Sequence, residues 1–421
     1  MKQFTYNVST LSSGLRLLHI PFEEAASVYV SMAGKVGRRA EHVTEVGAAH
    51  FLEHLFFDGT PRYPSSTALA RLIDGHGAQH NGSTDIALVD YYTHSLPEKA
   101  EACVDFVSDI FQNSLLREPD IEKERKVIRE EALAAKDDPH AFLWYEFVEY
   151  LYPDQALGRT FFAEEENLPN INHQVLETYM RRNYSAENFV LCIAGNISHE
   201  EAHRLGETYF KKIHRGQATV FDTPKFRKEG GVKFLHRPGA QAKLRIGFQG
   251  FDHYKPEAEM ATVLGGILGG LASSRLFIKL RDELHLVYGI GASHTDLSDT
   301  GYFSIVTSLQ EDKMQQAVNE IFSEIKRLMQ NGITDEELET VKNSVRTGMA
   351  FNVEKVGTHA NSAIEDLLLH GAIPQPKDEL EKILRITKAD VQHVAQTIFA
   401  DAPKIVALTE SVDSLAVPSL R

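Results

Sequence analysis

Two histidines and a glutamate form the pattern in this chain that is most suggestive of chemistry. His50 and His54 are four residues apart, and Glu53 lies between them in the order H-x-x-E-H. The surrounding run 47–57 has no proline and carries apolar residues at helical spacing, which predicts a largely buried helix. Residues four apart share a helix face, so the two imidazoles could bind one divalent ion. Glu53 would then lie where it could hold and deprotonate a water molecule.

A zinc site needs a third protein ligand, and the helix predicted for residues 119–136 offers candidates. Glu124 and Glu131 are seven residues apart, two turns along one face, and that face also carries Val127 and Ile128, so both should point toward the core. Glu130 falls in line with basic residues and is predicted to be solvated. We therefore expect Glu131 to complete a His2Glu set with one open position. Glu124 then suits a supporting role, accepting a hydrogen bond from a ligating histidine.

Each part of this pattern also has an ordinary structural explanation. A single histidine on an apolar helix is more often a satisfied core residue than a ligand, and two glutamates on a long helix more often belong to a solvated face. An H-x-x-E-H sequence is rare by chance at this composition. The histidine helix and the glutamate helix therefore indicate a metal site only in combination.

Segments with strand-like and helical patterns predict an α+β fold around these residues. The expected strands are 4–8 and 15–20, which form a hairpin, then 27–32, a pair within 79–95, and 189–195, and further helices are expected at 65–75 and 100–112. The order then recurs, with a strand at 243–248 and a helix at 256–269. The later segments match more closely, Tyr91–Leu96 with Phe303–Leu309 and Asp120–Glu122 with Asp335–Glu337.

This recurrence indicates an internal duplication of about half the chain. We expect two homologous domains, each a mainly antiparallel sheet packed with helices. Their limits are 1–215 for a zinc-binding catalytic domain, 216–230 for a linker and 231–421 for the second domain. The ligand pattern is not repeated, because the second half offers Glu339 and Arg346 at the positions of the two helix glutamates.

Composition excludes several classes of protein. A formal net charge of −15 argues against nucleic acid as a partner, and no run approaches the ~20 apolar residues of a membrane span. Cys103 and Cys192 form neither a C-x-x-C pair nor a disulfide framework, so we expect buried, reduced thiols. The first residues lack the apolar segment of a secretion signal, and we therefore expect a cytoplasmic location.

The combined motifs resemble the inverzincin metallopeptidases, which include pitrilysin, insulin-degrading enzyme and mitochondrial processing peptidase. The resemblance rests on the run 50–60 together with Glu131 in 124–131, and it is closest to the short bacterial members that resemble processing peptidase subunits. In the second half, residues 269–277 and 281–288 resemble the Arg/Tyr segment of the family. The resemblance therefore covers nearly the whole chain.

The resemblance implies specific roles. It implies one zinc ion per subunit, with the ligands His50, His54 and Glu131. By the same resemblance Glu53 is the general base and Glu124 the supporting acid. Arg281 and Tyr288 would contact substrate and stabilise the oxyanion of the transition state, which suits an always-charged donor and a neutral hydroxyl.

A short polar segment resembles the strand to which the substrates of this family add. Asn81, Gly82 and Thr84 match an Asn-Ala-x-Thr pattern on an edge strand, with glycine in place of alanine. Backbone pairing there would bind peptides with little sequence selectivity. Glycine loosens a strand, and a tight turn at Asn81-Gly82 is the alternative.

Together these features predict a zinc metalloendopeptidase that hydrolyses short or unfolded peptides. Pitrilysin carries four such domains and this chain two, so we expect a homodimer that encloses a chamber. The metal half of one subunit would face the Arg/Tyr half of the other. The alternatives are a non-catalytic structural or assembly subunit of the same fold, or one subunit of a heteromeric processing peptidase. Loss of a ligand or of Glu53 would mark the first alternative, and all are present.

Overall fold

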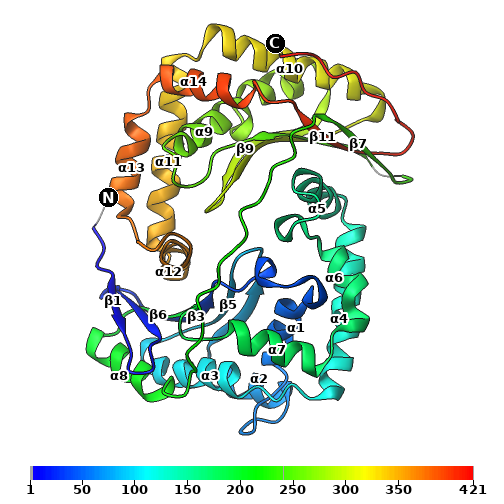
Figure 1. Ribbon diagram of the computed structural model, residues 1–421. Helices are drawn as coiled ribbons and strands as arrows, with labels where there is room; N and C mark the ends of the chain where they lie inside the picture. The colour runs from blue at the N-terminus through cyan, green and yellow to red at the C-terminus, as the bar shows by residue number, and fades with distance from the viewer. Residues whose placement is uncertain (1–2, 240, 421) are drawn as a thin grey trace. The chain divides into compact units, whose positions relative to one another are not determined.

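The computed structural model describes residues 3–239 and 241–420, which form two compact units. Each unit is discontinuous in sequence (Figure 1). The first consists of residues up to 133, 161–222 and 350–377, and the second of 134–160, 223–349 and 378 onward. The chain therefore crosses between the units five times after its start in the first.

A six-stranded sheet forms the centre of the first unit, in the order β1-β2-β6-β3-β5-β4. Its strands are β1 (Asn7–Thr10), β2 (Arg16–Pro21), β3 (Val28–Gly34), β4 (Gln79–Thr84), β5 (Val89–Ser95) and β6 (Phe189–Gly195). Only the pairing of β2 with β6 is parallel. Every residue of β3 and β6 is buried, as expected for central strands covered on both faces. The strand β4 lies at one edge of the sheet.

A five-stranded sheet forms the centre of the second unit, in the order β7-β11-β8-β10-β9. Its strands are β7 (Gly231–His236), β8 (Ala242–Gln249), β9 (Val287–Asp296), β10 (Gly301–Leu309) and β11 (Lys404–Thr409). The β11–β7 pair is parallel and the others are antiparallel. This order matches β2-β6-β3-β5-β4 strand for strand, so the predicted α+β fold with two homologous halves is confirmed.

Helices cover both faces of each sheet (Figure 1). The first unit contains α1 (Ala48–Phe56), α2 (Ser66–Gly75), α3 (Ala100–Asn113), most of α4 (Glu118–Asp137), α6 (Phe161–Asn167), α7 (His173–Asn183), α8 (His199–Tyr209) and α12 (Val356–Glu365). The second contains α5 (Pro139–Leu151), α9 (Glu257–Gly265), α10 (Met314–Asn331), most of α11 (Asp335–Glu354) and of α13 (Pro376–Arg385), and α14 (Lys388–Ile398). Short π-helical segments are η6 (Gly266–Gly270), η7 (Phe277–Glu283) and η9 (Asp366–His370).

The two halves of the chain exchange equivalent helices. The helix α12 follows α11 in the second half but packs on the first sheet, where Ala360 and Ile364 join a core with Ile20 and Val190. Reciprocally, α5 follows α4 in the first half but packs on β8 and β11 of the second sheet. Each sheet would leave an apolar face in water without the borrowed helix, so burial of that face links the two halves.

Several details differ from the sequence-based expectations. The hairpin is present, but its first strand begins at Asn7 rather than residue 4. The helix predicted for 256–269 is α-helical only to Gly265 and continues as the π-helical η6. Asn81 and Gly82 lie within β4 rather than in a turn. The chain enters the second unit for the second time after Asp222, within the predicted linker. The domain limits themselves stay a prediction.

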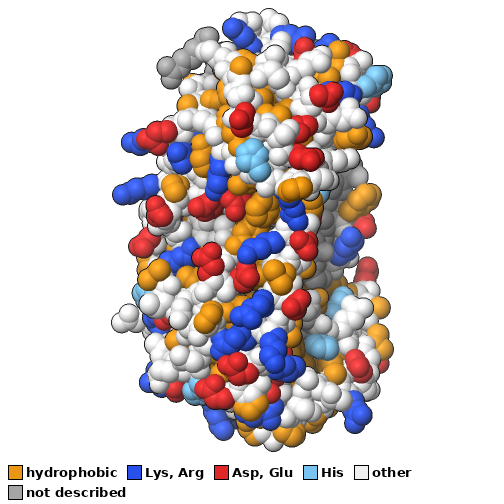
Figure 2. Space-filling model, turned by 90° about the vertical axis from the view of Figure 1, so that its right-hand side faces the viewer, with side chains coloured by type: hydrophobic (Ala, Val, Ile, Leu, Met, Phe, Trp, Pro, Cys, Tyr) orange, Lys and Arg blue, Asp and Glu red, His pale blue; other side chains and the backbone are white. Residues whose placement is uncertain are grey.

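The surface and the cysteines fit the composition. Both cysteines are buried and unpaired, as predicted. Figure 2 shows basic and acidic side chains interspersed over the face that it draws. Within the described residues, we find no helix with the length and hydropathy needed to cross a bilayer.

A charged residue introduced between α12 and the first sheet tests how much the packing of α12 contributes to stability. Ala360 is fully buried between α12 and the first sheet, whereas Thr358 on the same helix is exposed. Ala360→Asp buries an unpaired carboxylate and should lower the free energy of unfolding by about 3 kcal/mol or more. Thr358→Asp should change it by less than about 0.5 kcal/mol. Urea denaturation of zinc-free protein measures both, and equal midpoints for the two variants would contradict the exchanged packing.

Candidate metal centre

The short helix α1 is held at its start by a buried carboxylate. Gly47 precedes the helix with a φ of 93°, a left-handed conformation that glycine adopts without strain. Glu41 accepts hydrogen bonds from the N–H groups of Gly47 and Ala49, at 3.1 and 3.0 Å. These bonds satisfy donors that a helix N-terminus leaves unpaired. Burial, together with the nearby charge of Glu164, raises the pKa of Glu41 to about 8.

The two faces of α1 differ in burial. Phe51, Leu52, Leu55 and Phe56 are almost completely buried and fix the helix in the first unit. The predicted chemical residues His50, Glu53 and His54 share the other face and are half-buried. The helical period therefore separates the residues that anchor α1 from those that face the candidate site.

The helix α4 brings a third potential ligand to the two histidines. The Nε2 atoms of His50 and His54 are 3.3 Å apart, and Glu131 Oε2 lies 3.4 and 3.6 Å from them. A tetrahedral zinc ion with bonds of about 2.1 Å separates its ligand atoms by about 3.4 Å. The three atoms therefore fit one ion, and the donor set of two imidazoles and one carboxylate is one that zinc accepts.

Glu131 differs from its prediction in burial. Its side chain is 44% exposed, and Val127 on the same helix is also exposed, whereas Glu124 and Ile128 are buried. The expectation that both carboxylates point into the core therefore holds for Glu124 only. The position of Glu131 at the border with solvent leaves one side of the candidate site open to water.

The second ring nitrogen of His54 is held by Glu124. His54 Nδ1 lies 2.8 Å from Glu124 Oε2, so the imidazole donates there when Nδ1 carries its proton. Lys123 Nζ lies 2.9 Å from the other oxygen of Glu124 and donates to Asp58 at 2.6 Å. Burial raises the pKa of Glu124, but hydrogen bonds from His54 and Lys123 outweigh it and lower the pKa to about 2. Glu124 is therefore an ionised acceptor at neutral pH.

The second ring nitrogen of His50 faces a residue that the sequence analysis did not identify. His50 Nδ1 lies 3.1 Å from Oε2 of Glu164, whose side chain is 2% exposed on α6. Glu164 begins a run of three glutamates, a composition typical of solvated helix faces. The only signal in the sequence is the preceding Phe161-Phe162 pair, which is buried and turns this part of α6 inward.

Without a metal ion, both imidazoles are positively charged at neutral pH. Burial lowers the pKa of His50, but hydrogen bonds with Glu131 and Glu164 raise it to about 10. Partial burial also lowers the pKa of His54, but hydrogen bonds with Glu124 and Glu131 raise it to about 9. The same hydrogen bonds from the two histidines hold the pKa of Glu131 far below its usual range. In the zinc-free protein the two protonated imidazoles therefore supply the positive charge beside Glu131.

The edge strand β4 passes close to Glu53. A Cβ atom added to Gly82 would lie 2.9 Å from Glu53 Cγ, closer than real Cβ contacts allow, and 3.0 Å from the ring of Phe57, which is tighter than most. Glycine therefore permits this approach of strand and helix, which alanine would disturb. Asn81 is exposed beside it and Thr84 is half-buried, and β4 pairs only with β5 among the described residues. One edge of β4 is thus available for another strand.

The remaining predicted residues belong to the second unit. Arg281 lies in η7 with its guanidinium 4.7 Å from the ring centre of Phe277. Tyr288 lies in the edge strand β9 and is 52% exposed. The peptide between them turns at His285, which has a φ of 49° and whose Nδ1 lies 3.0 Å from the carbonyl of Arg281. The two residues predicted to stabilise the oxyanion therefore lie at either end of one short connection between η7 and β9.

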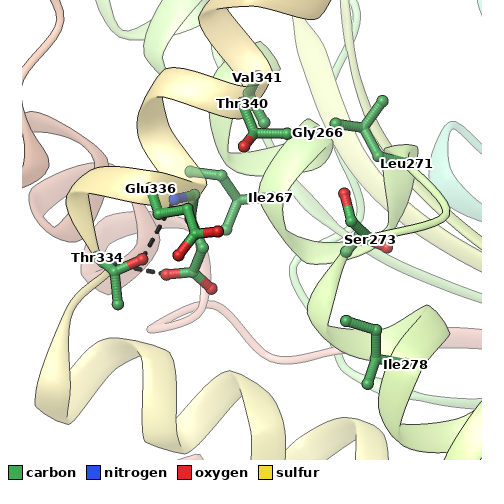
Figure 3. Close-up of a pocket in the computed structure, with 11 residues that line it drawn as sticks. Gly266, Ile267, Leu271, Ser273, Ile278, Thr334, Glu336, Thr340 and Val341 are labelled. Atoms are coloured by element: carbon green, nitrogen blue, oxygen red, sulfur yellow. Dashed lines mark hydrogen bonds between the residues drawn. The ribbon is translucent and has the colours of Figure 1, made fainter.

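A cavity of about 210 Å³ lies between residues 266–278, which precede Arg281 in the chain, and the start of α11 (Figure 3). Figure 3 shows Ser273 and Ile278 on one side and Thr334 and Glu336 on the other, at the start of α11. Thr334 and Glu337 exchange two hydrogen bonds there, of 2.7 and 3.2 Å. Arg275, which precedes η7, donates to the same Glu337 carboxylate. These bonds anchor the segment that leads to Arg281.

Comparison with known families finds matches in both halves of the chain. Residues 18–164 match the model described as Insulinase (Peptidase family M16), and residues 170–345 match the model described as Peptidase M16 inactive domain. The clustered residues His50, His54 and Glu131 all fall within the first match, as does Glu164 at its last position. Arg281 and Tyr288 fall within the second.

Individual proteins support these matches over nearly the whole chain. A protein of Rickettsia bellii named as an uncharacterized zinc protease is 32% identical, over 94% of this chain and 96% of its own. A crystal structure of a protease from Helicobacter pylori has a TM-score of 0.88 at 21% identity, covering 97% of this chain and 100% of that one. A chain of complex III2 from Candida albicans has a TM-score of 0.83 at 17% identity, covering 97% of each.

Zinc uptake should exchange protons for the metal ion. Because His50 and His54 each carry an extra proton in the zinc-free protein, binding of one zinc ion per chain should release about two protons near neutral pH. Affinity should therefore rise with pH, by up to about 100-fold per unit between pH 6 and 8. Competition with a chelator at several pH values measures this, and calorimetry in buffers of different ionisation enthalpy counts the protons. An affinity that does not change with pH would contradict the charged state of the imidazoles.

Proposed function

The chain belongs to peptidase family M16, and we propose that it is a zinc metalloendopeptidase that hydrolyses short or unfolded peptides. One observation carries the proposal: Nε2 of His50, Nε2 of His54 and Oε2 of Glu131 converge at separations of 3.3 to 3.6 Å. Glu53 lies on the same face of α1, between the two histidines and next to the edge strand. The family match of the ligand-bearing half agrees with this assignment.

The proposed roles follow from the chemistry of each side chain. Zinc bound by the two histidines and Glu131 would supply Lewis acidity toward the carbonyl of the scissile bond. Glu53 takes the proton of the attacking water and then passes it to the leaving amine as the C–N bond breaks. Glu124 and its neighbour Lys123 keep His54 oriented during this cycle. The fixed charges do not need to reorganise when the transition state forms.

The edge strand β4 is the proposed site for the peptide backbone. A substrate added as a further strand would donate to and accept from main-chain groups of β4, so binding would depend little on side chains. Asn81 and Thr84 would contact this peptide, and Gly82 would let it lie near Glu53. This arrangement suits extended or unfolded substrates, because a folded protein has no free strand to offer.

We further propose that two copies of the chain assemble into a homodimeric chamber. In this assembly Arg281 and Tyr288 of one subunit act on the substrate bound at the metal half of the other. Support comes from the presence of both motifs in one chain and from the exposure of both side chains. A cytoplasmic location is part of the same proposal, and the two unpaired thiols fit a reducing compartment.

A non-catalytic structural subunit is the second candidate. A chain of complex III2 from Candida albicans has a similar fold, so this fold also occurs as part of a larger complex. Retention of the three clustered side chains and of Glu53 favours the enzyme, because a purely structural subunit has no need of them.

Removal of the proposed base separates these two functions. Glu53→Gln keeps the volume and leaves all three ligands in place, so zinc content should stay at about one per chain while kcat falls by about 100-fold or more. Glu130→Gln on the exposed face of α4 serves as the matched control and should retain full activity. Cleavage of an unbiased peptide library, with metal analysis of each preparation, measures both. Undiminished cleavage by Glu53→Gln would remove this residue from the mechanism.

Mixing two inactive variants tests the shared site. If each site combines Glu53 of one subunit with Arg281 of the other, a heterodimer of Glu53→Gln and Arg281→Ala contains one intact site. An equal mixture after subunit exchange should then recover about a quarter of the wild-type activity. Light scattering of the mixture establishes the oligomeric state. A dimer that exchanges subunits without regaining activity would argue against sites shared between chains.

A further inference from the structure

We propose that Glu164 is a positioning residue of the metal centre, which fixes the tautomer and the ring orientation of His50. The inference rests on the proposed zinc site but not on the peptidase reaction. The family matches and relatives described above assign no role to this residue. Glu164 would do for His50 what Glu124 does for His54, although the two carboxylates come from different helices.

The contact between Glu164 and His50 has the geometry that this role requires. Oε2 of Glu164 lies 3.1 Å from Nδ1 of His50, whereas Nε2 of the same ring lies 3.4 Å from Glu131. The ring therefore spans the distance between the two carboxylates. A proton held on Nδ1 by Glu164 leaves the lone pair of Nε2 available to a metal ion. The opposite tautomer would turn an N–H group toward the metal position.

The surroundings of Glu164 hold its carboxylate in place. Its side chain is 2% exposed, and its second oxygen lies 3.8 Å from the guanidinium of Arg38, which is itself buried. The ring of Phe161 packs edge-on against the imidazole of His50, with centroids 5.2 Å apart. A buried carboxylate between a cation and an imidazole donor has little freedom to move away.

Two similar networks thus support the two imidazoles. Behind His54 lie Glu124 and then Lys123, and behind His50 lie Glu164 and then Arg38. The backbone N–H of Arg38 donates to the carbonyl of Asp85, directly after the edge strand β4, at 3.1 Å. The support of His50 therefore connects one metal ligand with the end of the proposed substrate strand.

A neighbouring glutamate on the same helix provides a matched control. Glu166 lies two residues later on the same helix and is exposed. Glu164→Gln and Glu166→Gln remove the same charge from the same helix, but only the first changes the partner of His50.

Metal affinity and a spectroscopic signature test the proposal without any assay of cleavage. Glu164→Gln should weaken zinc binding by about 10–100-fold, measured by chelator competition, whereas Glu166→Gln should bind as wild type. Cobalt substituted for zinc should show a changed visible absorption spectrum in Glu164→Gln, because the orientation of one imidazole changes. Equal affinity and spectra in the two variants would overturn the proposal. Normal zinc binding with no cleavage by wild type would instead contradict the proposed function.

A double-mutant cycle separates positioning from a general effect on folding. If Glu164 acts through His50, Glu164→Gln should weaken zinc binding no further in a protein that already carries His50→Ala. If it acts only on the fold, the loss should be the same in both backgrounds, and this result would overturn the proposal. Urea denaturation of the zinc-free variants measures any change in stability alongside.

Discussion

The candidate site depends on one constraint: two imidazoles on a nine-residue helix must present the same ring nitrogen to one point. Helical geometry brings their Nε2 atoms within 3.3 Å, but it does not determine the tautomers. Carboxylates on two other helices contact the opposite nitrogens, and the third potential ligand lies on one of these helices. A hydrogen bond from Nδ1 of each ring to a carboxylate therefore leaves the lone pair of Nε2 available for a metal ion.

That constraint explains the charge distribution around α1. Glu124 and Glu164 are buried, and each lies close to a cation, Lys123 and Arg38 respectively. Buried carboxylates without such partners would be protonated or would destabilise the fold. A bound dication would replace the extra imidazole protons and reduce the repulsion among the surrounding acids. The same interactions therefore determine the affinity of the site for a metal ion and for protons.

The duplicated halves show how one fold can carry different chemistry. The two sheets have the same strand order, and their edge strands β4 and β9 occupy equivalent positions. The first half places its polar residues beside β4, whereas the second carries Arg281 in η7, just before β9, and Tyr288 at the start of β9. Exchange of α5 and α12 ties the halves together, since each sheet needs apolar surface from the other half of the chain.

The sequence by itself determined the fold class, the duplication and most of the residues that the structure brings together. Periodicity sufficed there, because the shared face of His50 and His54 and the spacing of Glu124 and Glu131 are local properties of single helices. Only the tertiary structure decided that Glu131 lies at the solvent border, that Glu164 faces His50 and that α12 covers the first sheet. These features depend on contacts between segments far apart in the chain. The run of glutamates at 164–166 is typical of a solvated helix face, and only the packing of α6 buries Glu164.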